Sequence, residues 1–385
     1  KVENTLNFLS KCSSIFRENI DAKIISITGS CGKTSLKEMI GVILKKISRT
    51  TYSPKSFNNK YGVPLSLFNL KQNDNFGIFE VGMDKTGEID SLTKMIKPDL
   101  GIITNISYAH SKNFENINQI ADAKAEIMNN IKKNGLIVLN KDDYFYDQHK
   151  NFAIKKKLKV ISFGIDNKFS MIKLIKVKRN KNKYELFINV NGLLVSFYSY
   201  NKNKSHLYNI LATIASINVF ININKFKKNI FLNLKTPNGR GDISKIQLKN
   251  KKIFLVDETY NSNPLSLKTA IENYDKIKSK NSKKYLVLGD MLELGKHSIK
   301  QHKLISKIVN KTKINQVYVI GKYIKKTFYG LKSNKKAEIL NNKIDILNLI
   351  KNNLNNNDYI MIKGSNSTGL HKIATNLKQR NSNVI

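Results

Sequence analysis

The sequence is poor in the residues that disulfide-built, zinc-binding and membrane-spanning proteins need. It contains no tryptophan, five prolines and two cysteines, Cys12 and Cys31, in 385 residues. Neither cysteine has histidine or cysteine partners at zinc-ligand spacing, and two cysteines make no disulfide framework, so we expect a cytoplasmic protein. The longest apolar stretches, such as 210–220, are far shorter than a bilayer span and contain polar residues, so we expect no transmembrane segment.

Acidic residues and arginine are also scarce. The chain has 28 acidic against 67 basic residues, a formal net charge of +39. Only five of the basic residues are arginine, namely Arg17, Arg49, Arg179, Arg240 and Arg380. A nucleic-acid surface more often uses arginine forks with interleaved aromatic side chains. Lysine and asparagine share A-rich codons, so we interpret the excess of both as a genomic bias and predict no nucleic-acid partner, beyond non-specific attraction of polyanions at low salt.

The most informative stretch is 24–39, IISITGSCGKTSLKEM. An apolar strand leads into a glycine-bearing loop, and Lys33 and Thr34 then open an amphipathic helix. Backbone N–H groups of residues 29–32 can approach phosphate oxygens, while Lys33 reaches the outer phosphates and Thr34 can ligate Mg²⁺. A nucleoside triphosphate is the implied ligand. The P-loop pattern is incomplete, because Ile27 stands where its first glycine belongs, and an ordinary strand-to-helix turn is the alternative.

Strand-like and helix-like segments alternate along the first half of the chain. This pattern predicts an α/β fold with a parallel sheet, whose ligands sit at the carboxyl ends of the strands. The end residues expected beside the glycine loop are Glu80, Asn105 and His110. Short alternating runs over 162–199, with Asn191-Gly192 as a hairpin turn, predict antiparallel strands that extend the sheet. The expected strands are 51–52, 77–81, 100–104 and 136–140, and the expected helices 2–18, 61–70, 88–96, 117–131 and 205–220.

A lysine- and asparagine-rich passage, 222–237, followed by Asn-Gly-Arg-Gly at 238–241, is typical of a linker. The alternation then restarts, which predicts a second α/β domain. We therefore expect two domains, 1–235 and 236–385. The expected strands of the second are 243–248, 253–256, 285–288, 316–320 and 359–362, and its expected helices 265–277, 299–309, 344–354 and 368–377.

Loop motifs along nearly the whole chain resemble those of the Mur ligases, in the order that the family has them. They are Ser30–Thr34 within TGSCGKT, NNKYGVPLSL at Asn58–Leu67, FEVGMDKTGEI at Phe79–Ile89, ITNISYAH at Ile103–His110, ADAKAEI at Ala121–Ile127, GRGD at Gly239–Asp242, DETYNSNPLS at Asp257–Ser266, LGDMLELG at Leu288–Gly295 and IKGSNS at Ile362–Ser367. The YNSNP and LGDMLELG strings are the most specific to one branch, the ligases that add D-alanyl-D-alanine.

The resemblance implies a fold and an activity. The fold is a P-loop-type central ATPase domain, with a parallel sheet and an antiparallel extension, followed by a Rossmann-like α/β C-terminal ligase domain. The activity is ATP-dependent joining of D-alanyl-D-alanine to UDP-N-acetylmuramoyl-tripeptide through an acyl phosphate, in peptidoglycan precursor synthesis, by a monomer. The chain begins where the central domain of the family begins, so we expect the small amino-terminal domain that binds the UDP-sugar to be missing.

The resemblance also implies the catalytic and metal-binding residues. Lys33, Glu80, His110 and Lys124 are implied as catalytic. Thr34 and Glu80 would hold one Mg²⁺, and His110 and Lys124 a second, with Lys124 carbamylated by CO₂. Taken alone, Glu80 could equally form a salt bridge, His110 could be a structural imidazole, and Lys124 could be one of many solvated lysines.

Nucleotide and substrate contacts are implied from both domains. The ATP-binding residues are Gly29, Ser30, Cys31, Gly32, Lys33, Thr34, Ser35, Asn209, Arg240 and Asp257. The substrate-binding residues are Asn58, Asn59, Tyr260, Asn261, Asn263 and Lys363. Asn58 and Asn59 could instead be ordinary turn residues, and Asn263-Pro264 also has the form of a helix start, with Asn as the cap.

Two departures from the family pattern weaken individual contacts. Ser205 and His206 stand where the family has His and Asn before Asn209, and Asn366 replaces a usual arginine. Two alternatives remain at this stage. One is a related ligase with another amino acceptor, either a diverged Mur enzyme or one like folylpolyglutamate synthase. The other is a basic P-loop protein that uses nucleotide as a switch near nucleic acid.

Overall fold

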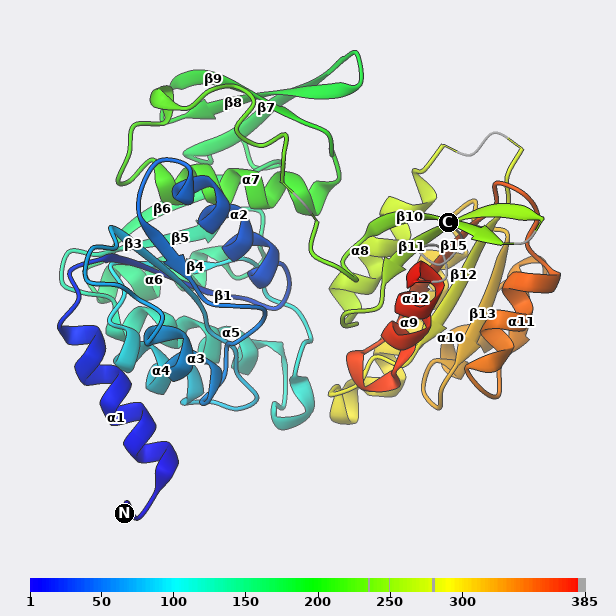
Figure 1. The fold of residues 1–385 in the computed structure, drawn as a ribbon, viewed down its shortest axis with the longest axis horizontal. Coiled ribbons are helices and arrows are strands. Elements are labelled where there is room, and N and C mark those ends of the chain that lie inside the picture. Colours follow the sequence, from blue (N-terminus) through cyan, green and yellow to red (C-terminus); the bar gives the residue numbers. More distant parts are fainter. Residues whose placement is uncertain (235, 249, 279–280, 380–385) are drawn as a thin grey trace. The chain divides into compact units, whose positions relative to one another are not determined.

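The chain folds into two compact units (Figure 1). A computed structural model describes residues 1–385 except 235, 249, 279–280 and 380–385. The first unit comprises Lys1–Ser107 and Asn113–Lys235, and the second comprises Tyr108–Lys112 and Thr236–Ile385. Residue 235, where the first expected domain ends, lies outside the described residues. The sequence did not predict that Tyr108–Lys112 would belong with the second unit.

The first unit is built on a nine-stranded sheet with the order β2-β3-β1-β4-β5-β6-β7-β8-β9. Neighbouring strands from β2 to β7 pair in parallel, whereas β8 and β9 run antiparallel to their neighbours. The expected parallel sheet with an antiparallel extension is thereby confirmed. The strands are β1 Lys23–Thr28, β2 Thr50–Tyr52, β3 Phe76–Glu80, β4 Leu100–Ile103, β5 Leu136–Asn140, β6 Lys159–Gly164, β7 Ile172–Asn180, β8 Lys183–Val190 and β9 Leu193–Ser199.

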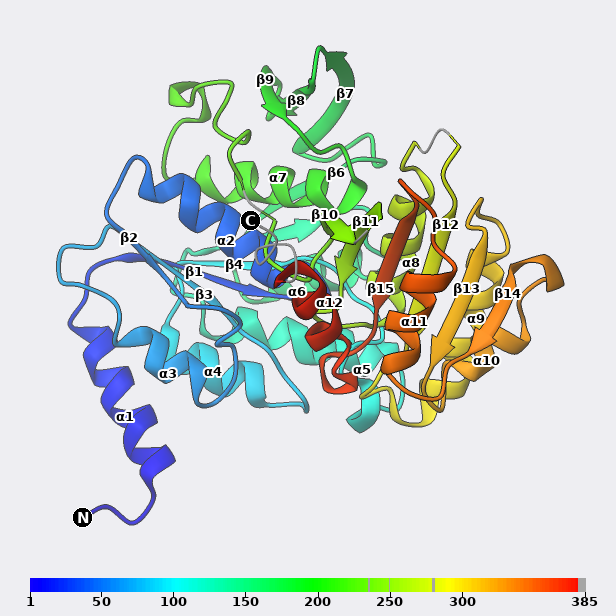
Figure 2. The ribbon, with the colours of Figure 1, turned by 45° about the vertical axis from the view of Figure 1, so that its right-hand side comes forward.

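Helices cover both faces of this sheet (Figures 1 and 2). Helices α2 and α7 share one face, where their apolar side chains pack with β1, β4 and β5 and with the β7–β9 ribbon in one core. Helices α3, α4 and α5 lie on the other face. The helices are α1 Thr5–Glu18, α2 Lys33–Lys45, α3 Gly62–Leu67, α4 Glu88–Ile96, α5 Ile117–Ala125, α6 Tyr146–Lys155 and α7 Lys204–Ile217.

Some expected elements of the first unit were wrong. The helix expected over 117–131 ends at Ala125 and continues as a 3₁₀-helix, Glu126–Asn130. Helix α6 was not identified, and β6, which begins before the expected antiparallel region, pairs in parallel with β5. The hairpin turn at Asn191-Gly192 is confirmed, because both residues have positive φ angles (52° and 92°) between β8 and β9.

The second unit is a six-stranded sheet with the order β10-β11-β15-β12-β13-β14, in which only β10 runs antiparallel to its neighbour. Helices α8, α9 and α10 pack on one face and α11 and α12 on the other, giving two cores. The strands are β10 Asp242–Leu248, β11 Lys251–Glu258, β12 Lys284–Gly289, β13 Gln316–Ile320, β14 Lys336–Ile339 and β15 Tyr359–Lys363. The helices are α8 Pro264–Asp275, α9 Ser298–Val309, α10 Lys325–Tyr329, α11 Ile344–Asn352 and α12 Leu370–Gln379.

The order of this second sheet brings three loops together. Strand β15 lies between β11 and β12, so the loops that follow these three strands leave the sheet side by side. Two short elements, α10 and β14, were not identified from the sequence. Within the described part of the chain, no helix has the length and apolar character needed to cross a membrane.

Candidate active site

The loop after β1 turns at two glycines with positive φ angles. Gly29 has φ +137° and Gly32 has φ +85°, conformations that side chains disfavour. A Cβ atom on Gly29 would lie 1.9 Å from Thr104 Oγ1, so the loop backbone touches the residue that follows β4. Gly32 is the N-cap of α2 and has no side chain, so the amides of the first helical turn are available to an anion.

The loop after β4 holds this phosphate loop in shape. The Asn105 side chain accepts a hydrogen bond from the Cys31 N–H (3.0 Å) and donates to the Cys31 carbonyl (3.1 Å), to which Thr104 Oγ1 also donates (2.6 Å). The Ser30 hydroxyl donates to the Ser107 carbonyl (2.9 Å) and accepts from the Ser107 N–H (2.8 Å). The loop is therefore preorganised by its neighbour.

Lys33 and Ser35 lie in the first turn of α2 and are both half-buried. The Lys33 ammonium donates to the Gly29 carbonyl across the loop (2.8 Å). A phosphate oxygen arriving over the loop would meet this ammonium as well as the backbone amides, because the long lysine side chain can turn outward. The role of residues 29–35 in binding ATP stays a prediction.

Thr34 and Glu80 meet behind the loop. The Thr34 hydroxyl donates to Glu80 Oε2 over 2.7 Å and lies 3.0 Å from the Ser56 hydroxyl. The other carboxylate oxygen, Oε1, accepts from the Asn58 side-chain amide (2.7 Å). Asn58 is itself fixed, since its carbonyl accepts the Gly82 N–H (2.7 Å). The end of β3, the start of α2 and the loop after β2 therefore converge on one carboxylate.

The environment of Glu80 fits a magnesium ion. Its side chain is 1% exposed, and among the described residues no lysine, arginine or histidine forms an ion pair with it. A buried carboxylate with neutral donors alone is costly, and a divalent cation would remove that cost. Across the described residues, no group of three or more His, Cys, Asp and Glu residues could hold a metal. A magnesium ion here would take the Thr34 and Glu80 oxygens and complete its shell with phosphate and water.

Asn58 and Asn59 differ in what they do. The Asn59 side-chain oxygen accepts the N–H groups of Tyr61 (3.1 Å) and Gly62 (2.9 Å) at the start of α3. That is the behaviour of a turn residue, the alternative left open for both asparagines. Asn58 instead contacts Glu80, so of the two only Asn58 reaches the acidic group of the site.

Lys124 is buried near the end of α5, with 2% of its surface exposed. Burial lowers its pKa well below the usual lysine value, and repulsion from Lys33 lowers it further. Its small neighbours Ala121, Ala123 and Ala125 are also buried, as the packed-site interpretation expected. Burial of this kind favours the neutral, nucleophilic form of the amine over the ammonium.

Asn209 lies beside the phosphate loop, because a Cβ atom on Gly32 would approach its Oδ1 to 3.3 Å. The neighbouring departure from the family pattern has a structural explanation. His206 is turned into the protein, where its Nε2 lies 3.1 Å from the Ser199 hydroxyl at the end of β9, and burial lowers its pKa to about 4. His206 therefore supports the antiparallel ribbon as a neutral side chain.

His110 belongs to the second unit. Its Nδ1 lies 2.6 Å from Glu293 Oε2, and this hydrogen bond lowers the pKa of Glu293 against the opposing effect of burial. The backbone around this pair is held in a defined conformation. His110 (φ 53°) and Glu293 (φ 64°) both adopt left-handed conformations, and the Lys112 N–H donates to the Glu293 carbonyl (2.9 Å). The metal-binding role of His110 stays a prediction.

Arg240 and Tyr260 form a stacked pair in the second unit. The Arg240 guanidinium carbon lies 3.9 Å from the centroid of the Tyr260 ring. Two backbone contacts fix the pair, because the Tyr260 N–H donates to the Gly239 carbonyl (3.0 Å) and the Asp242 carboxylate accepts the Gly239 N–H (2.7 Å). The stacking presents a planar guanidinium with a defined orientation.

Asp257 is buried and engaged on both carboxylate oxygens. Oδ1 accepts from the Thr259 N–H (3.0 Å) and hydroxyl (2.6 Å), and Oδ2 accepts from the Lys378 ammonium, which also donates to Asp242. Burial alone would lower the pKa of Lys378, but its contacts with the carboxylates of Asp242 and Asp257 outweigh that effect, so the pKa is raised. Asp257 therefore acts within an ion-pair cluster at the amino end of β10 and the carboxyl end of β11.

The remaining predicted substrate residues line the adjoining loops. Lys363, 2% exposed, donates to the Asn261 carbonyl (3.0 Å) and lies 3.2 Å from Glu258 Oε2, so it braces the loop after β11. Asn263 caps α8 in a capping box with Ser266, followed by Pro264 at the helix start, which is the structural alternative stated for it.

The departure at Asn366 has a contact of its own. The Asn366 side chain donates to the Tyr260 carbonyl (3.2 Å). The residue thus links the loop after β15 to the loop that carries the Arg240 stack, which an arginine in the same place could also do.

Several residues of the site were not found from the sequence. Lys37 and Ser56 support the loop around Asn58, and Lys378 holds Asp257. Glu126, directly after the AKA motif, accepts the Gly87 and Asp90 N–H groups and so caps α4. Of these residues, only Glu126 could have been singled out in the sequence, because it lies within the ADAKAEI motif. Nothing in the sequence distinguishes Lys37 and Lys378 from the many other lysines of the chain.

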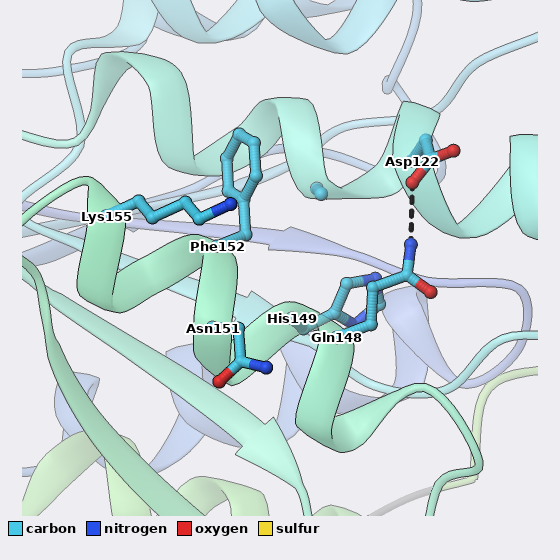
Figure 3. A pocket seen from close by; sticks show the side chains of 7 residues that line it. Asp122, Gln148, His149, Asn151, Phe152 and Lys155 are labelled. Carbon is cyan, nitrogen blue, oxygen red and sulfur yellow. Dashed lines mark hydrogen bonds between the residues drawn. The ribbon is translucent and has the colours of Figure 1, made fainter.

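A pocket of about 390 Å³ lies between α5 and α6 (Figure 3). Gln148 donates to Asp122 across it (2.6 Å), and the buried ring of His149 donates to the Ala121 carbonyl (3.1 Å). Burial lowers the pKa of His149. None of the predicted site residues lines this pocket.

Comparison with known families agrees with the motifs. Residues 27–217 match the Mur ligase middle domain, and residues 244–366 match the Mur ligase glutamate ligase domain. A UDP-N-acetylmuramoyl-tripeptide--D-alanyl-D-alanine ligase from Buchnera aphidicola subsp. Baizongia pistaciae is 32% identical over 380 residues, which cover 98% of this chain and 80% of the relative.

Solved structures agree on the fold. MurF from Acinetobacter baumannii superposes with a TM-score of 0.86 at 24% identity, covering 98% of this chain and 81% of that one. MurF ligase from Thermotoga maritima, solved in complex with ADP, gives a TM-score of 0.83 at 23% identity, covering 99% and 85%.

Proposed function

This chain belongs to the Mur ligase family, and on that premise we propose that it is the ATP-dependent ligase that joins D-alanyl-D-alanine to UDP-N-acetylmuramoyl-tripeptide. The proposal includes a cytoplasmic, monomeric enzyme of peptidoglycan precursor synthesis. The similarity to relatives of that name over nearly the whole chain supports the substrates. The observation that carries the chemistry is the buried Thr34–Glu80 pair behind the phosphate loop.

The reaction has two steps. A terminal carboxylate oxygen of the tripeptide attacks the γ-phosphorus of ATP, which gives an acyl phosphate and ADP. The amine of D-alanyl-D-alanine then attacks the acyl carbon, the amide forms, and inorganic phosphate leaves with both electrons of the broken C–O bond while the nitrogen loses a proton. Both steps develop negative charge on phosphoryl oxygens, which fixed donors and cations stabilise.

Residues of the first unit are suited to the triphosphate. The amides of the loop and of the first turn of α2 can donate to phosphate oxygens, and Lys33 adds a cation at their edge. The clamp made by Asn105 and Thr104 supports this assignment, because it fixes the loop before ligand arrives and so reduces the entropy lost on binding.

Magnesium is proposed at Thr34 and Glu80, where it would neutralise phosphate charge in both steps. His110 and Lys124 are proposed for a second ion, Lys124 as its carbamate. Burial that favours the neutral amine supports carbamate formation, because only the neutral amine adds to CO₂. Loss of one proton turns the penalised ammonium into the neutral amine, and formation of the N–C bond to CO₂ with loss of a second proton leaves an anion beside Lys33.

Residues of both units supply the remaining proposed contacts. Arg240 is proposed to reach the ATP phosphates, and its stack on Tyr260 supports this by fixing the guanidinium plane. Asp257 and Asn209 are proposed to contact the nucleotide. Asn58, Asn59, Tyr260, Asn261, Asn263 and Lys363 are proposed on the substrate side, where Lys363 acts by bracing the Asn261 loop.

Phosphate release tests the proposal. ATP and Mg²⁺ are supplied with the UDP-tripeptide, with D-alanyl-D-alanine, or with both, to the protein and to Lys33→Ala. Release that needs both substrates and is lost in Lys33→Ala is the expected result. Release with the UDP-tripeptide and a different amino acceptor would favour a diverged ligase, and salt-sensitive polynucleotide binding without any release would favour the nucleotide-switch alternative.

A further inference from the structure

One lysine of the phosphate-loop helix is completely buried. Lys37 lies one helical turn after Lys33 on α2 and has 0% of its surface exposed, among the largest fully buried side chains of the described residues. Lysine is rarely buried unless its charge is paired. Lys37 has no place in the chemistry above, so its burial needs a separate explanation.

The ammonium of Lys37 has a full set of partners. It donates to the carbonyl oxygens of Ser53 and Lys55, each at 2.5 Å, and lies 3.0 Å from Glu38 Oε1. An ammonium has three N–H donors, so these contacts use all of them. Charge-assisted hydrogen bonds of this kind are stronger than neutral ones, and the ammonium therefore fixes two carbonyls of one loop.

That loop, residues 53–58, leads from β2 to the acidic group of the site. Its Ser56 hydroxyl lies 3.0 Å from Thr34 Oγ1, and its Asn58 amide donates to Glu80 Oε1. The loop thus places one partner on each of the two side chains to which magnesium is assigned. Outer partners of metal ligands commonly decide ligand orientation and metal affinity.

The loop needs an anchor because its backbone is not that of a helix or strand. Lys55 has φ +46°, a left-handed conformation that is unfavourable for a non-glycine residue. The two carbonyls that Lys37 binds belong to this residue and to Ser53, two positions before it. A buried cation under the turn offsets this cost and holds the turn where Ser56 and Asn58 can reach their partners.

We propose that Lys37 is a positioning residue of the magnesium-nucleotide site, which acts through the 53–58 loop on Thr34 and Glu80. Lys33 and Lys37 then divide two tasks along one helix: the half-buried lysine meets phosphate, and the buried lysine sets the geometry of the oxygens that hold the metal. This inference rests on the proposed function only in requiring that the site bind Mg²⁺ and ATP.

The test measures nucleotide binding rather than ligation. Calorimetric titration with a non-hydrolysable ATP analogue, repeated over a range of Mg²⁺ concentrations, gives the Mg²⁺ concentration that half-saturates binding. Lys37→Met keeps the length and apolar stem of the side chain but removes its three donors. It should raise this concentration by about 10- to 100-fold, the usual effect of losing an outer partner of a metal ligand, because without Lys37 the loop no longer holds Ser56 and Asn58 against Thr34 and Glu80. Lys46→Met, at an exposed lysine that forms the C-cap of the same helix, is the matched control and should leave this concentration unchanged.

A double-mutant cycle tests whether the effect runs through the loop. Ser56→Ala removes the hydroxyl beside Thr34 without touching Lys37, and alone it should shift the Mg²⁺ dependence in the same direction. If Lys37 acts through this loop, the two substitutions affect the same contacts. The double variant Lys37→Met with Ser56→Ala should then raise the half-saturating Mg²⁺ concentration by a factor clearly smaller than the product of the two single factors. Should Lys37→Met fail to fold, Lys37→Gln, which keeps a donor but loses the charge, takes its place in the cycle.

Three results would overturn the inference. An unchanged Mg²⁺ dependence in a folded Lys37 variant would make the buried lysine a stability element only, and so would independent, multiplicative effects in the cycle. If the unmodified protein shows no Mg²⁺-dependent nucleotide binding, the proposed function itself falls, and the inference falls with it.

Discussion

The Thr34 hydroxyl and the Glu80 carboxylate, 46 positions apart in the chain, share a hydrogen bond of 2.7 Å behind the phosphate loop. This contact joins the start of the helix that follows the glycine loop to the end of the neighbouring strand β3. It makes one oxygen-rich corner in which a hydroxyl and a buried carboxylate face the place where phosphates are expected.

Removing the charge of Glu80 should separate metal binding from folding. Glu80→Gln keeps the size and can still accept from Thr34, so the midpoint of urea unfolding should change little. Mg²⁺-dependent ATP turnover should fall by about 100-fold or more, because the amide cannot neutralise the cation. Glu272→Gln, at an exposed ion pair on α8, is the control and should retain full turnover. Normal turnover in Glu80→Gln would exclude this carboxylate from the metal site.

Gly29→Ala should destabilise the protein more than the same substitution at another glycine with positive φ. Gly29 (φ +137°) and Gly192 (φ +92°) both have backbone conformations that alanine disfavours, so either substitution should introduce backbone strain. At Gly29 the new Cβ would also meet Thr104 Oγ1, whereas at Gly192 it meets nothing within 4 Å. Chemical denaturation should show a larger loss for Gly29→Ala, together with lost ATP binding. Equal losses would argue against the close approach to Thr104.

The buried amine of Lys124 should make stability depend on pH. Its folded pKa is lowered, so in CO₂-free buffer the unfolded chain binds more protons between that value and about 10.4, and stability rises with pH across this window. Lys124→Met removes the penalty. The variant should therefore be more stable than the unmodified protein at pH 7, and the difference should shrink toward pH 10. A difference independent of pH, measured by urea unfolding, would contradict the burial argument.

The same lysine should respond to CO₂. Lys124→Ala should be inactive and partly recovered by a small added carboxylate, because such an anion can take the place of the carbamate. Depletion of CO₂ should lower the activity of the unmodified protein, and bicarbonate should restore it. Full activity of Lys124→Ala would remove the carbamate from the mechanism.

The cluster at Asp257 should contribute stability through Lys378. Lys378→Met leaves two carboxylates near each other without their cation, which should cost about 1–3 kcal/mol after allowance for partial exposure. Because the folded pKa of Lys378 is raised, this contribution is fully present below about pH 10.4 and is lost only as the pH rises through the higher folded value. Lys268→Met, at an exposed pair, should cost under about 0.5 kcal/mol. Comparable losses in the two variants, measured by urea unfolding at pH 7, would contradict this role.

What the sequence predicted depended on whether the signal was local. The glycine loop, its following helix and Glu80 at a strand end were recognisable because strand, turn and helix chemistry lie within a few residues of one another. Asn263 and Pro264 were read as a helix start for the same reason, and the structure shows that cap.

What the sequence missed depended on distant contacts. The buried partners of Lys37 and Lys378 come from elsewhere in the fold, and nothing local distinguishes these lysines from solvated ones. The pairing of His110 with Glu293 spans 183 positions and draws a short segment into the second unit. Helix α6 escaped notice because few of its residues are apolar, and α10 because it is only five residues long.

The most direct measurement follows the carboxylate oxygen of the UDP-tripeptide into the released phosphate. The terminal carboxylate of the UDP-tripeptide is labelled with ¹⁸O, and the inorganic phosphate released with ATP, Mg²⁺ and D-alanyl-D-alanine is analysed by mass. The account predicts one ¹⁸O in each phosphate released, with the other retained in the new amide carbonyl, because the phosphorylated carboxylate oxygen leaves with the phosphate. Phosphate that carries no label, or label transfer unchanged in Lys33→Ala, would contradict an acyl phosphate formed at this site.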